Sequence, residues 1–276
     1  MPIVAYQGEP GAFSEQAARS FFSKNVKTKP VASFKDVFRF VEGGTSRAGI
    51  IPIENSLFGS VHENYDLLLR HRLYIVGEIK LRIEHHLMAL PGVSLRQLRF
   101  VYSHPQALGQ CEKFLRTLRN VSVVAEYDTA GSAKLIRDHR RSDAAAIASA
   151  QAARVYGLRV LKKNIESNHQ NYTRFLILSR RKSQPTAKAK TSLVFSVKNV
   201  PGALQRALSV FAAENIDLLK IESRPLIGRP WEYLFYADVQ GSQHEKKLRT
   251  ALTSLREFCM FLTVFGSYHT GKTVRT

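Results

Sequence analysis

Short polar clusters recur through the first two thirds of the sequence, each beside an apolar run that predicts a strand. They are, in chain order, GEPGAFSE (8–15), ENSLFGS (54–60), SHPQ (103–106), DTAG (128–131) and NYTRF (171–175). Their hydroxyl and amide side chains donate and accept hydrogen bonds, and backbone N–H groups at helix starts bind anions. These residue types predict a site that can bind an anionic molecule.

The NYTRF cluster runs directly into FLIL, which predicts a buried strand. Alternation along that strand puts Thr173 and Phe175 on one face, where Phe175 can shield the hydroxyl from solvent, and Arg174 on the other. Two interpretations of Thr173 fit: a cleft residue that acts on a ligand, or a strand-end hydroxyl that satisfies the backbone. Arg174 can likewise bind a carboxylate with both nitrogens or pair with an acidic neighbour.

The ENSLFGS cluster follows the apolar run IIPI. Asn55 can donate from its amide to a carboxylate or a hydroxyl. Glu54 can carry a raised pKa if it is buried, or can cap the helix that follows. Gly59 and Ser60 would let the backbone approach a ligand closely.

The SHPQ cluster opens a predicted helix, on which Gln106 and Gln110 share one face at i and i+4. Ser103 beside His104 suggests a hydrolase, but the geometry of a catalytic triad is not set by adjacency in sequence. No G-x-S-x-G motif accompanies the pair. We therefore discard the hydrolase interpretation.

Two more clusters predict anion-binding helix starts. In DTAG, residues 129–131 would present backbone N–H groups, with Thr129 as the side-chain donor. GEPGAFSE is similar, with Ser14 in the first turn. It is not a phosphate-binding P-loop, because the lysine and the full glycine spacing are absent.

The elements that must position these clusters alternate through about residue 180. Short apolar runs such as IVAYQ and RFVYS alternate with segments whose apolar residues recur at helical spacing. Such a pattern predicts α/β layers with a mostly parallel sheet, which binds ligands at the carboxyl ends of its strands. Since the polar clusters fall at those ends, we expect a cleft between two α/β lobes.

The pattern changes after residue 180. Residues 181–191 are basic and contain proline, which predicts a linker, and residues 271–276 form a basic tail. Between them, residues 192–270 follow the order β-α-β-β-α-β, which is the ferredoxin-like arrangement. Such domains pair through exposed strand edges or helices, so we expect dimerisation.

Composition narrows the class of protein. A chain of 276 residues with 44% hydrophobic residues can bury one large core or two ordinary ones, and no apolar run is long enough to cross a bilayer. A predicted strand begins almost at Met1, and the two cysteines, Cys111 and Cys259, suit a reducing compartment, so we expect a cytoplasmic protein. The net charge of +19 is scattered in short runs, without a nucleic-acid-binding motif, so we expect neither a nucleic-acid partner nor a membrane.

The clusters GEPGAFSE, PIENSLFGSVHENYDLL, SHPQALGQC, DTAG, AAIAS with YGL, and NYTRF occur in one order in prephenate dehydratases, and arogenate dehydratases share them. NVPGALQRAL and IESRP in the second region resemble the phenylalanine-binding signature of an ACT-type regulatory domain. The resemblance implies a bilobal, periplasmic-binding-protein-like catalytic domain over residues 1–180 and an ACT domain over 192–270. It also implies a homodimer or homotetramer, no metal or organic cofactor, and feedback control by phenylalanine.

The implied reaction is a decarboxylative dehydration, in which prephenate loses carbon dioxide and a ring hydroxyl to give phenylpyruvate. Thr173 matches the threonine placed as proton donor to the leaving hydroxyl. Because a threonine hydroxyl is a weak acid, we expect it to relay a proton from Glu54, His104 or water. Arogenate as substrate, and an anion- or amino-acid-binding protein without catalysis, are the alternatives.

The site residues follow from the residue chemistry and the resemblance together. The expected catalytic residues are Thr173, Glu54, Asn55, Ser103 and Gln110. The expected substrate-binding residues are Ser14, Ser56, Ser60, His104, Thr129, Arg174 and Phe175. The expected effector-binding residues are Asn199, Gly202, Ala203, Leu204, Glu222, Ser223, Arg224 and Pro225.

Overall fold

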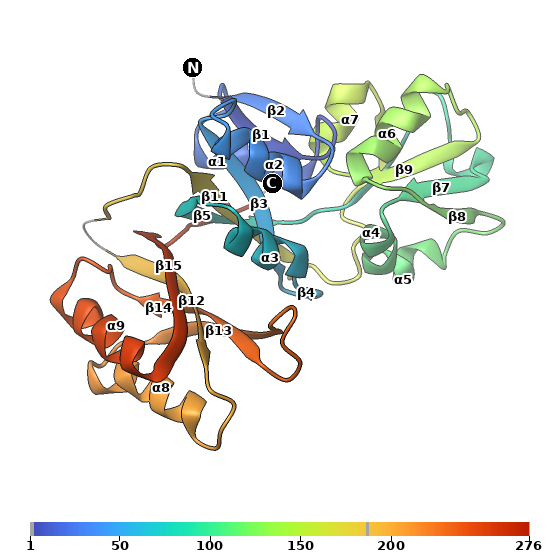
Figure 1. Cartoon of the computed structure of the whole chain (residues 1–276). Helices are drawn as coiled ribbons and strands as arrows, with labels where there is room; N and C mark the ends of the chain where they lie inside the picture. Colours follow the sequence, from blue (N-terminus) through green and yellow to red (C-terminus); the bar gives the residue numbers. More distant parts are fainter. Residues whose placement is uncertain (1–2, 186–187, 276) are drawn as a thin grey trace. The chain divides into compact units, whose positions relative to one another are not determined.

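The computed structural model describes residues 3–185 and 188–275, which form two compact units (Figure 1). The N-terminal unit comprises residues up to 69, 79–176 and those from 272 onward; the C-terminal unit comprises residues 70–78 and 177–271. The expected fold class is confirmed. The first unit has two α/β lobes, each built on its own sheet, and the second has the order βαββαβ.

The first lobe is built on a seven-stranded sheet with the strand order β16-β5-β11-β3-β1-β2, in which β4 pairs with β3. Its elements are β1 (Ile3–Gln7), α1 (Phe13–Phe21), β2 (Lys27–Val31), α2 (Phe34–Glu42), β3 (Ala48–Asn55), β4 (Gly59–Ser60), α3 (His62–Arg70), β5 (Tyr74–Arg82), β11 (Tyr172–Ser179) and β16 (Thr273–Val274). Strand β1 runs parallel to β2 and β3. The apolar face of α2 packs closely on β3, because a Cβ at Gly49 would come within 2.7 Å of Val37.

The second lobe is built on a five-stranded sheet with the order β10-β6-β9-β7-β8. Its elements are β6 (His86–Ala89), a 3-10 turn η1 (Leu95–Gln97), β7 (Phe100–Ser103), α4 (Pro105–Gln110), α5 (Glu112–Leu115), β8 (Ser122–Ala125), α6 (Thr129–Asp138), β9 (Ala144–Ala148), α7 (Ala150–Tyr156) and β10 (Arg159–Lys162). Strand β7 is parallel to β8 and β9, whereas β6 and β10 are antiparallel to their neighbours. The sheet is therefore mixed rather than mostly parallel, because the chain enters and leaves this lobe through β6 and β10.

Two segments carry the chain between the lobes, residues 83–85 on the way out and 163–171 on the way back. They are bonded to each other: the N–H of Ile83 donates to the carbonyl of Asn171, and the N–H of Ile165 donates to the carbonyl of His85. Hydrogen bonds between the two crossing segments hold their side chains in fixed places beside both sheets.

The loop after β1 also contacts the second lobe. Gly11 has φ +92°, and a Cβ there would come within 2.6 Å of the Cα of Ala152 on α7. Its carbonyl accepts a hydrogen bond of 2.7 Å from the hydroxyl of Ser149. Only glycine allows both this backbone conformation and this approach.

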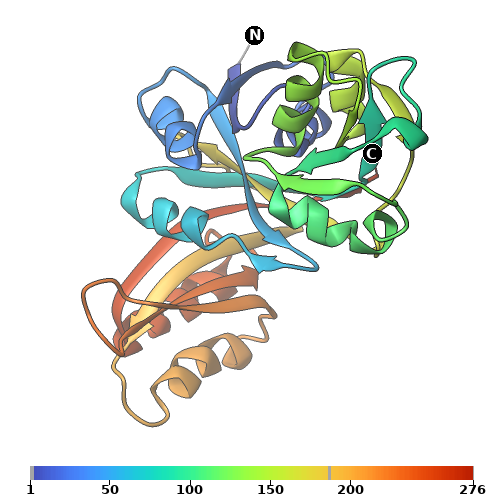
Figure 2. The same cartoon turned by 90° about the vertical axis from the view of Figure 1, so that its right-hand side faces the viewer.

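The C-terminal unit has a four-stranded antiparallel sheet with the order β13-β14-β12-β15, and α8 and α9 cover one of its faces (Figures 1 and 2). Its elements are β12 (Ala189–Val197), α8 (Ala203–Ala213), β13 (Leu218–Pro225), β14 (Tyr233–Gln240), α9 (Lys246–Phe258) and β15 (Cys259–His269). Strand β12 begins inside the segment expected as linker, of which residues 186 and 187 lie outside the described residues. In the expected tail, Thr273 and Val274 pair with Lys80 and Leu81 of the first unit.

A buried ion pair holds residues 70–78 within the C-terminal unit. The ammonium of Lys190 lies 2.9 Å from the carboxylate of Glu78, and both side chains are at most 6% exposed. Glu78 also accepts a hydrogen bond from the N–H of Gly271. A Cβ at Gly266 would lie 2.2 Å from the carbonyl oxygen of Ile75, so this packing requires glycine.

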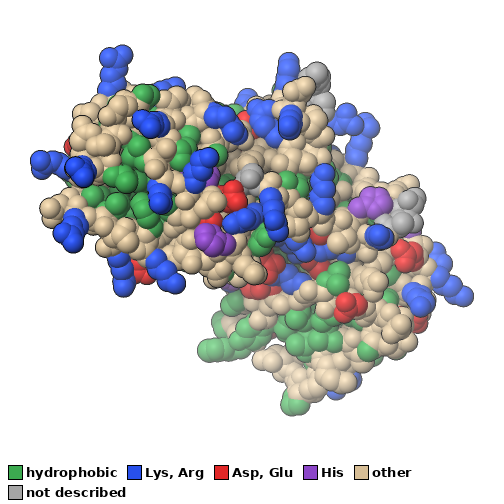
Figure 3. Space-filling view, turned by 180° about the vertical axis from the view of Figure 1, so that it is seen from behind, with side chains coloured by type: hydrophobic (Ala, Val, Ile, Leu, Met, Phe, Trp, Pro, Cys, Tyr) green, Lys and Arg blue, Asp and Glu red, His purple; other side chains and the backbone are tan. Residues whose placement is uncertain are grey.

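On the face drawn in Figure 3, lysine and arginine side chains are spread out rather than gathered in one patch. Within the described residues, no helix is long and apolar enough to span a membrane. The same residues contain no group of three or more His, Cys, Asp or Glu side chains arranged to hold a metal ion.

Candidate active site

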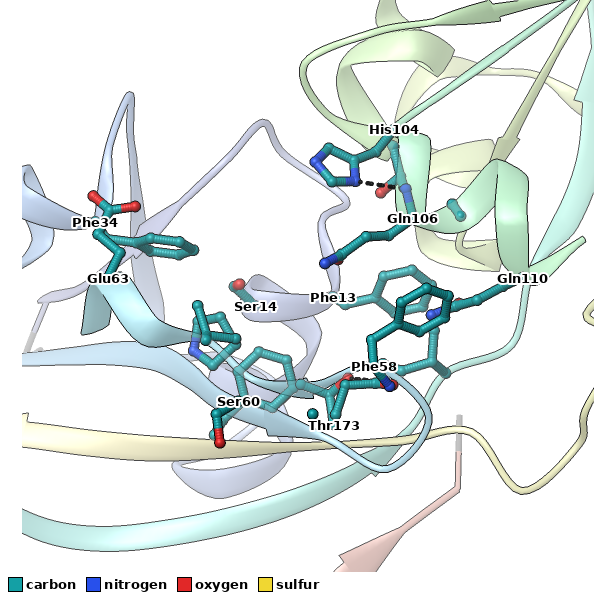
Figure 4. Close-up of a pocket in the computed structure, with 18 of the residues that line it drawn as sticks. Phe13, Ser14, Phe34, Phe58, Ser60, Glu63, His104, Gln106, Gln110 and Thr173 are labelled. Carbon is teal, nitrogen blue, oxygen red and sulfur yellow. Dashed lines mark hydrogen bonds between the residues drawn. The ribbon is translucent and has the colours of Figure 1, made fainter. Parts of the chain in front are cut away.

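A cavity of about 490 Å³ opens within the N-terminal unit and takes its lining from both lobes and from a crossing segment (Figure 4). The lining residues are Phe13, Ser14, Phe34, Pro52, Asn55, Phe58, Gly59, Ser60, Val61, His62, Glu63, Ile83, His85, His104, Gln106, Ala107, Gln110, Thr129, Thr173 and Phe175. Its size suits a small organic molecule. The mixture of aromatic rings with amide and hydroxyl groups suits a ring that carries polar substituents.

Five helices begin at this cavity. Each places a residue of its first turn in the lining: Phe13 on α1, Phe34 on α2, His62 on α3, Gln106 on α4 and Thr129 on α6. The partial positive charge at a helix start favours a negatively charged ligand. Among the described residues that line the cavity there is no lysine or arginine. The site therefore favours an anion mainly through helix starts and neutral donors.

Asn55 at the end of β3 organises the cavity floor. Its Oδ1 accepts hydrogen bonds from the N–H groups of Leu57 and Phe58, at 2.9 and 3.1 Å. Its Nδ2 donates to Oδ1 of Asn171 at 2.8 Å and to Oγ1 of Thr173 at 2.9 Å. The turn after β3 and the strand β11 are thus held to one amide group, whose orientation the two backbone donors fix.

Gln110 brings the second lobe into the same network. Its Oε1 lies 2.7 Å from Nδ2 of Asn171 and 2.6 Å from Nε2 of His85. A carbonyl oxygen of an amide can only accept, so both neighbours donate to it. The amide nitrogen of Gln110 then remains as the donor that this residue can offer to a ligand.

The alternation predicted along β11 is present. Thr173 and Phe175 both line the cavity. Arg174 does not line it, and its residue is only 9% exposed to solvent. Gln106 and Gln110 also line it together, as expected from their helical spacing. The strand and helix periods therefore put these side chains on the expected faces.

Four of the expected catalytic and substrate-binding residues do not line the cavity: Glu54, Ser56, Ser103 and Arg174. Ser56 instead connects the turn to β11, since its hydroxyl donates to the carbonyl of Gln170 and accepts from the N–H of Tyr172. Ser103 is fully buried, and its hydroxyl donates to the carbonyl of Ile147 at 2.7 Å. In this structure both serines bond to backbone groups.

The DTAG helix start differs from the expectation of an open anion site. Oδ1 of Asp128 accepts hydrogen bonds from the N–H groups of Ala130 and Gly131, at 2.6 and 3.0 Å. The carboxylate of the chain itself therefore occupies the place expected for a ligand anion, although Thr129 still lines the cavity. Burial raises the pKa of Asp128, while these backbone hydrogen bonds lower it.

Burial favours the neutral form of two histidines in the lining. Burial lowers the pKa of His85, against the hydrogen bond to Gln110 and the charge of Glu166, which raise it. Burial likewise lowers the pKa of half-buried His104, whose Nδ1 accepts from the N–H of Gln106. Neutral imidazoles serve a ligand as hydrogen-bonding groups rather than as charges.

The structure adds residues that the sequence did not single out for the site. Asn171 belongs to the NYTRF cluster, but His85 lies in RIEHHLMAL, which matches none of the motifs. Phe34 and Phe58 come from α2 and from the turn between β3 and β4. Only folding places these side chains beside Thr173.

The expected effector residues lie at two places in the C-terminal unit. Residues 199–204 form the turn from β12 into α8, where Gly202 has φ +76°. Residues 222–225 end the edge strand β13. The amide of Asn199 donates to the carbonyl of Trp231 at 3.1 Å, which holds this turn to the β13–β14 connection.

A two-lobed α/β unit with a polar-floored, anion-favouring cavity, joined to a βαββαβ unit, defines an enzyme for a small anionic substrate with an added regulatory domain. A family model described as prephenate dehydratase matches residues 4–183, and one described as ACT domain matches residues 191–257. The chain belongs to the prephenate dehydratase family, and its C-terminal region is an ACT domain.

Named relatives agree with this membership. The chain is 47% identical over 276 residues to arogenate dehydratase/prephenate dehydratase 2, chloroplastic, of Arabidopsis thaliana, covering 96% of this chain and 72% of the relative. The crystal structure of a prephenate dehydratase from Arthrobacter aurescens in complex with L-Phe is 30% identical, with a TM-score of 0.89 over 97% of this chain and 89% of that one. GqqA, described as a novel type of quorum quenching acylase, is 36% identical, also with a TM-score of 0.89, over 97% and 98% of the two chains.

Proposed function

We propose that this hydro-lyase converts prephenate into phenylpyruvate, carbon dioxide and water, with Thr173 acting on the leaving hydroxyl. The observation that carries the proposal is the 2.9 Å hydrogen bond from Asn55 to Thr173 on the floor of the cavity. Because Oγ1 of Thr173 accepts this hydrogen bond, its own hydrogen is directed elsewhere. Its position in the lining makes a hydroxyl of the bound molecule a suitable acceptor.

The chemistry balances with one proton. The bond from the ring to its carboxylate breaks and releases carbon dioxide, and the electron pair enters the ring. The ring hydroxyl at the opposite carbon departs and takes up one proton to form water, which leaves an aromatic ring. Donation from Asn55 stabilises negative charge on Oγ1 while the Thr173 proton is shared with the leaving group. Of the proton sources considered, His104 lines the cavity and Glu54 does not.

The two carboxylates of prephenate require donors. The amide nitrogen of Gln110 supplies one donor, and the start of α1, which no side chain caps, supplies others. Phe13, Phe58 and Phe175 surround the ring and exclude water from the departing groups. The polar donors hold the carboxylates and the phenylalanine side chains hold the ring, so the bonds to the departing carboxylate and hydroxyl can break in one geometry.

Arogenate is the second substrate to test, because the name of the Arabidopsis relative contains both activities.

An acylase activity is not proposed. The Thr173 hydroxyl accepts from a neutral amide, and such a contact does not activate a nucleophile by removing its proton.

The direct test measures product formation by the full chain from prephenate and from arogenate. We expect turnover of prephenate to fall by at least about 100-fold in Thr173→Ala with the thermal midpoint kept. Turnover of neither substrate by the wild-type protein would overturn the proposal. Turnover of arogenate alone would reassign the substrate.

We also propose that the chain forms a homodimer or homotetramer and that its ACT domain binds phenylalanine. The proposed effector-binding residues are Asn199, Gly202, Ala203, Leu204, Glu222, Ser223, Arg224 and Pro225. The L-Phe complex of the Arthrobacter enzyme supports the effector. The exposed apolar side chains of the C-terminal unit, among them Leu219, Ile221 and Trp231, support association between copies of the chain.

The two free cysteines support a reducing compartment, proposed as the cytoplasm. Calorimetry tests the binding of phenylalanine, and light scattering tests the oligomeric state. A Gly202→Ala variant that binds phenylalanine as the wild type does would overturn the effector site.

A further inference from the structure

We infer that His85 is a positioning residue for the proposed reaction: as the Nε2–H tautomer, it turns the amide of Gln110 so that the nitrogen of Gln110 faces the substrate. His85 lines the cavity from the first crossing segment and is 2% exposed. It acts through Gln110 and needs no contact with the reacting atoms. The effect of His85 on turnover rests on the proposed function, whereas its tautomer and its contact with Gln110 do not.

The direction of every hydrogen bond in the network follows from two backbone groups. The N–H groups of Leu57 and Phe58 can only donate, so the atom of Asn55 that they contact is its oxygen. The other end of Asn55 is therefore its NH₂ group, which donates to Oδ1 of Asn171 and to Thr173. This assigns both ends of the Asn55 amide without reference to a ligand.

The assignment continues across the cavity floor. Since Oδ1 of Asn171 accepts from Asn55, the other end of Asn171 is the NH₂ group that donates to Gln110 at 2.7 Å. The receiving atom of Gln110 is then its oxygen, which also lies 2.6 Å from Nε2 of His85. Two acceptors would repel at that distance, so Nε2 of His85 carries a hydrogen.

The other ring nitrogen points to the same tautomer independently. Nδ1 of His85 is buried and has no hydrogen-bond partner among residues 3–185 and 188–275. A buried N–H without an acceptor is rarer and more costly than a buried lone pair without a donor. Nδ1 therefore carries the lone pair, and burial lowers the pKa of the ring, which favours its neutral form.

The surroundings of His85 hold the ring in this place. Its backbone N–H donates to Oε2 of Glu166 at 3.0 Å, and its carbonyl accepts from Ile165. The ring of Phe13 meets the imidazole edge-on, with centroids 5.4 Å apart. With the backbone and the ring both fixed, the Nε2–H has one direction, which is toward Gln110.

Removal of this donor would leave Gln110 with one donor in place of two. The amide could then turn and present its oxygen to a substrate carboxylate, which is repulsive. His85→Gln is the matched rescue, because a glutamine amide nitrogen reaches about as far as the Nε2 of histidine and can donate to the same oxygen. His85→Phe keeps a ring of similar size and cannot donate.

The kinetic test compares kcat and KM for prephenate in the full chain. We expect kcat to fall about 10- to 100-fold in His85→Phe and to recover to within about threefold of wild type in His85→Gln. His86→Phe is the control, since His86 is also buried but accepts from the N–H of Asn164 and does not line the cavity. An unchanged kcat in His85→Phe, or an equal loss in both His85 variants, would overturn the inference.

A second measurement does not depend on turnover. Long-range ¹H–¹⁵N correlation spectra of the wild-type protein distinguish the two tautomers of a histidine, and the signal lost in His85→Gln assigns the ring. We expect the neutral Nε2–H form at pH 7; the Nδ1–H form or a charged ring would contradict the hydrogen-bond chain. If the wild-type protein turns over neither substrate, the proposed function fails, while the spectrum still decides the tautomer of His85 and with it the direction of its hydrogen bond to Gln110.

Discussion

The amide nitrogen of Asn55 donates to the hydroxyl oxygen of Thr173 across 2.9 Å, from the end of β3 to the start of β11, although 118 positions separate the two residues. This contact makes the Thr173 hydroxyl an acceptor toward the protein and leaves its hydrogen for the ligand. The position of Thr173 in the lining gives the hydroxyl its function, because threonine alone is a poor acid.

Thr173→Val should keep the fold and lose turnover. Valine has the shape of threonine without the hydroxyl. No group at this position can then pass a proton to the departing hydroxyl, and the Asn55 N–H that now donates to Thr173 loses this acceptor. We expect kcat to fall by about 100-fold or more, with a smaller change in KM, in a steady-state assay with prephenate. Thr173→Ser keeps the hydroxyl and should retain a measurable rate; equal loss in both variants would mean that packing, not the hydroxyl, matters.

Asn55→Asp should reduce kcat/KM by about 100-fold or more. The carboxylate would place oxygen where an NH₂ group now donates to Asn171 and Thr173, and would add a negative charge beside a substrate dianion. Asn168→Asp is the control, because Oδ1 of Asn168 only accepts from the N–H of Gln170, which aspartate can also do. Similar kinetics for the two aspartate variants would show that Asn55 does not organise the site.

Gly11→Ala should destabilise the N-terminal unit strongly. The new methyl group would meet the backbone of Ala152 at 2.6 Å, and the residue would keep a positive φ. We expect a loss of more than about 2 kcal/mol in the free energy of unfolding, measured by urea denaturation. Gly157→Ala shares the positive φ but has no atom within 4 Å of its Cβ, so it should cost only about 1 kcal/mol. Equal losses would contradict the close approach at Gly11.

Glu78→Gln should destabilise the C-terminal unit by several kcal/mol, because it leaves the buried ammonium of Lys190 without its 2.9 Å counter-charge. The loss expected on breaking a buried pair is about 3–5 kcal/mol, and thermal unfolding followed by far-UV circular dichroism would report it. Glu112→Gln breaks an exposed pair with Arg116 and should cost below about 0.5 kcal/mol. A comparable midpoint in Glu78→Gln and wild type would refute the role of the ion pair.

Stability should fall as the pH drops below the ordinary histidine pKa of 6.5. Burial lowers the pKa of His85 and His86 in the folded chain, so the unfolded chain binds more protons between the lowered values and 6.5. The free energy of unfolding therefore rises with pH in that window and levels off above it. We expect a lower thermal midpoint at pH 5.5 than at pH 7.5, and a smaller difference in His85→Gln; an unchanged difference would mean that His85 is not buried neutral.

Much of the fold follows from local patterns in the sequence. The period of two along β11 predicts the shared face of Thr173 and Phe175, and the helical spacing of Gln106 and Gln110 predicts theirs. The β-α-β-β-α-β order after residue 188 likewise follows from apolar periodicity. These features depend on residues only a few positions apart in the chain, so the sequence alone is enough to predict them.

Contacts between distant segments required the folded chain. Ser103 and Gln110 belong to one motif, yet folding turns Ser103 to a backbone carbonyl and Gln110 to the cavity. Asp128 caps its own helix, and the crossing segment brings His85 within 2.6 Å of Gln110. The sequence by itself determined the family, the order of elements and most polar residues of the site. The tertiary structure decided which side chains meet and in which direction each hydrogen bond runs, because those depend on distances between segments that chain order does not specify.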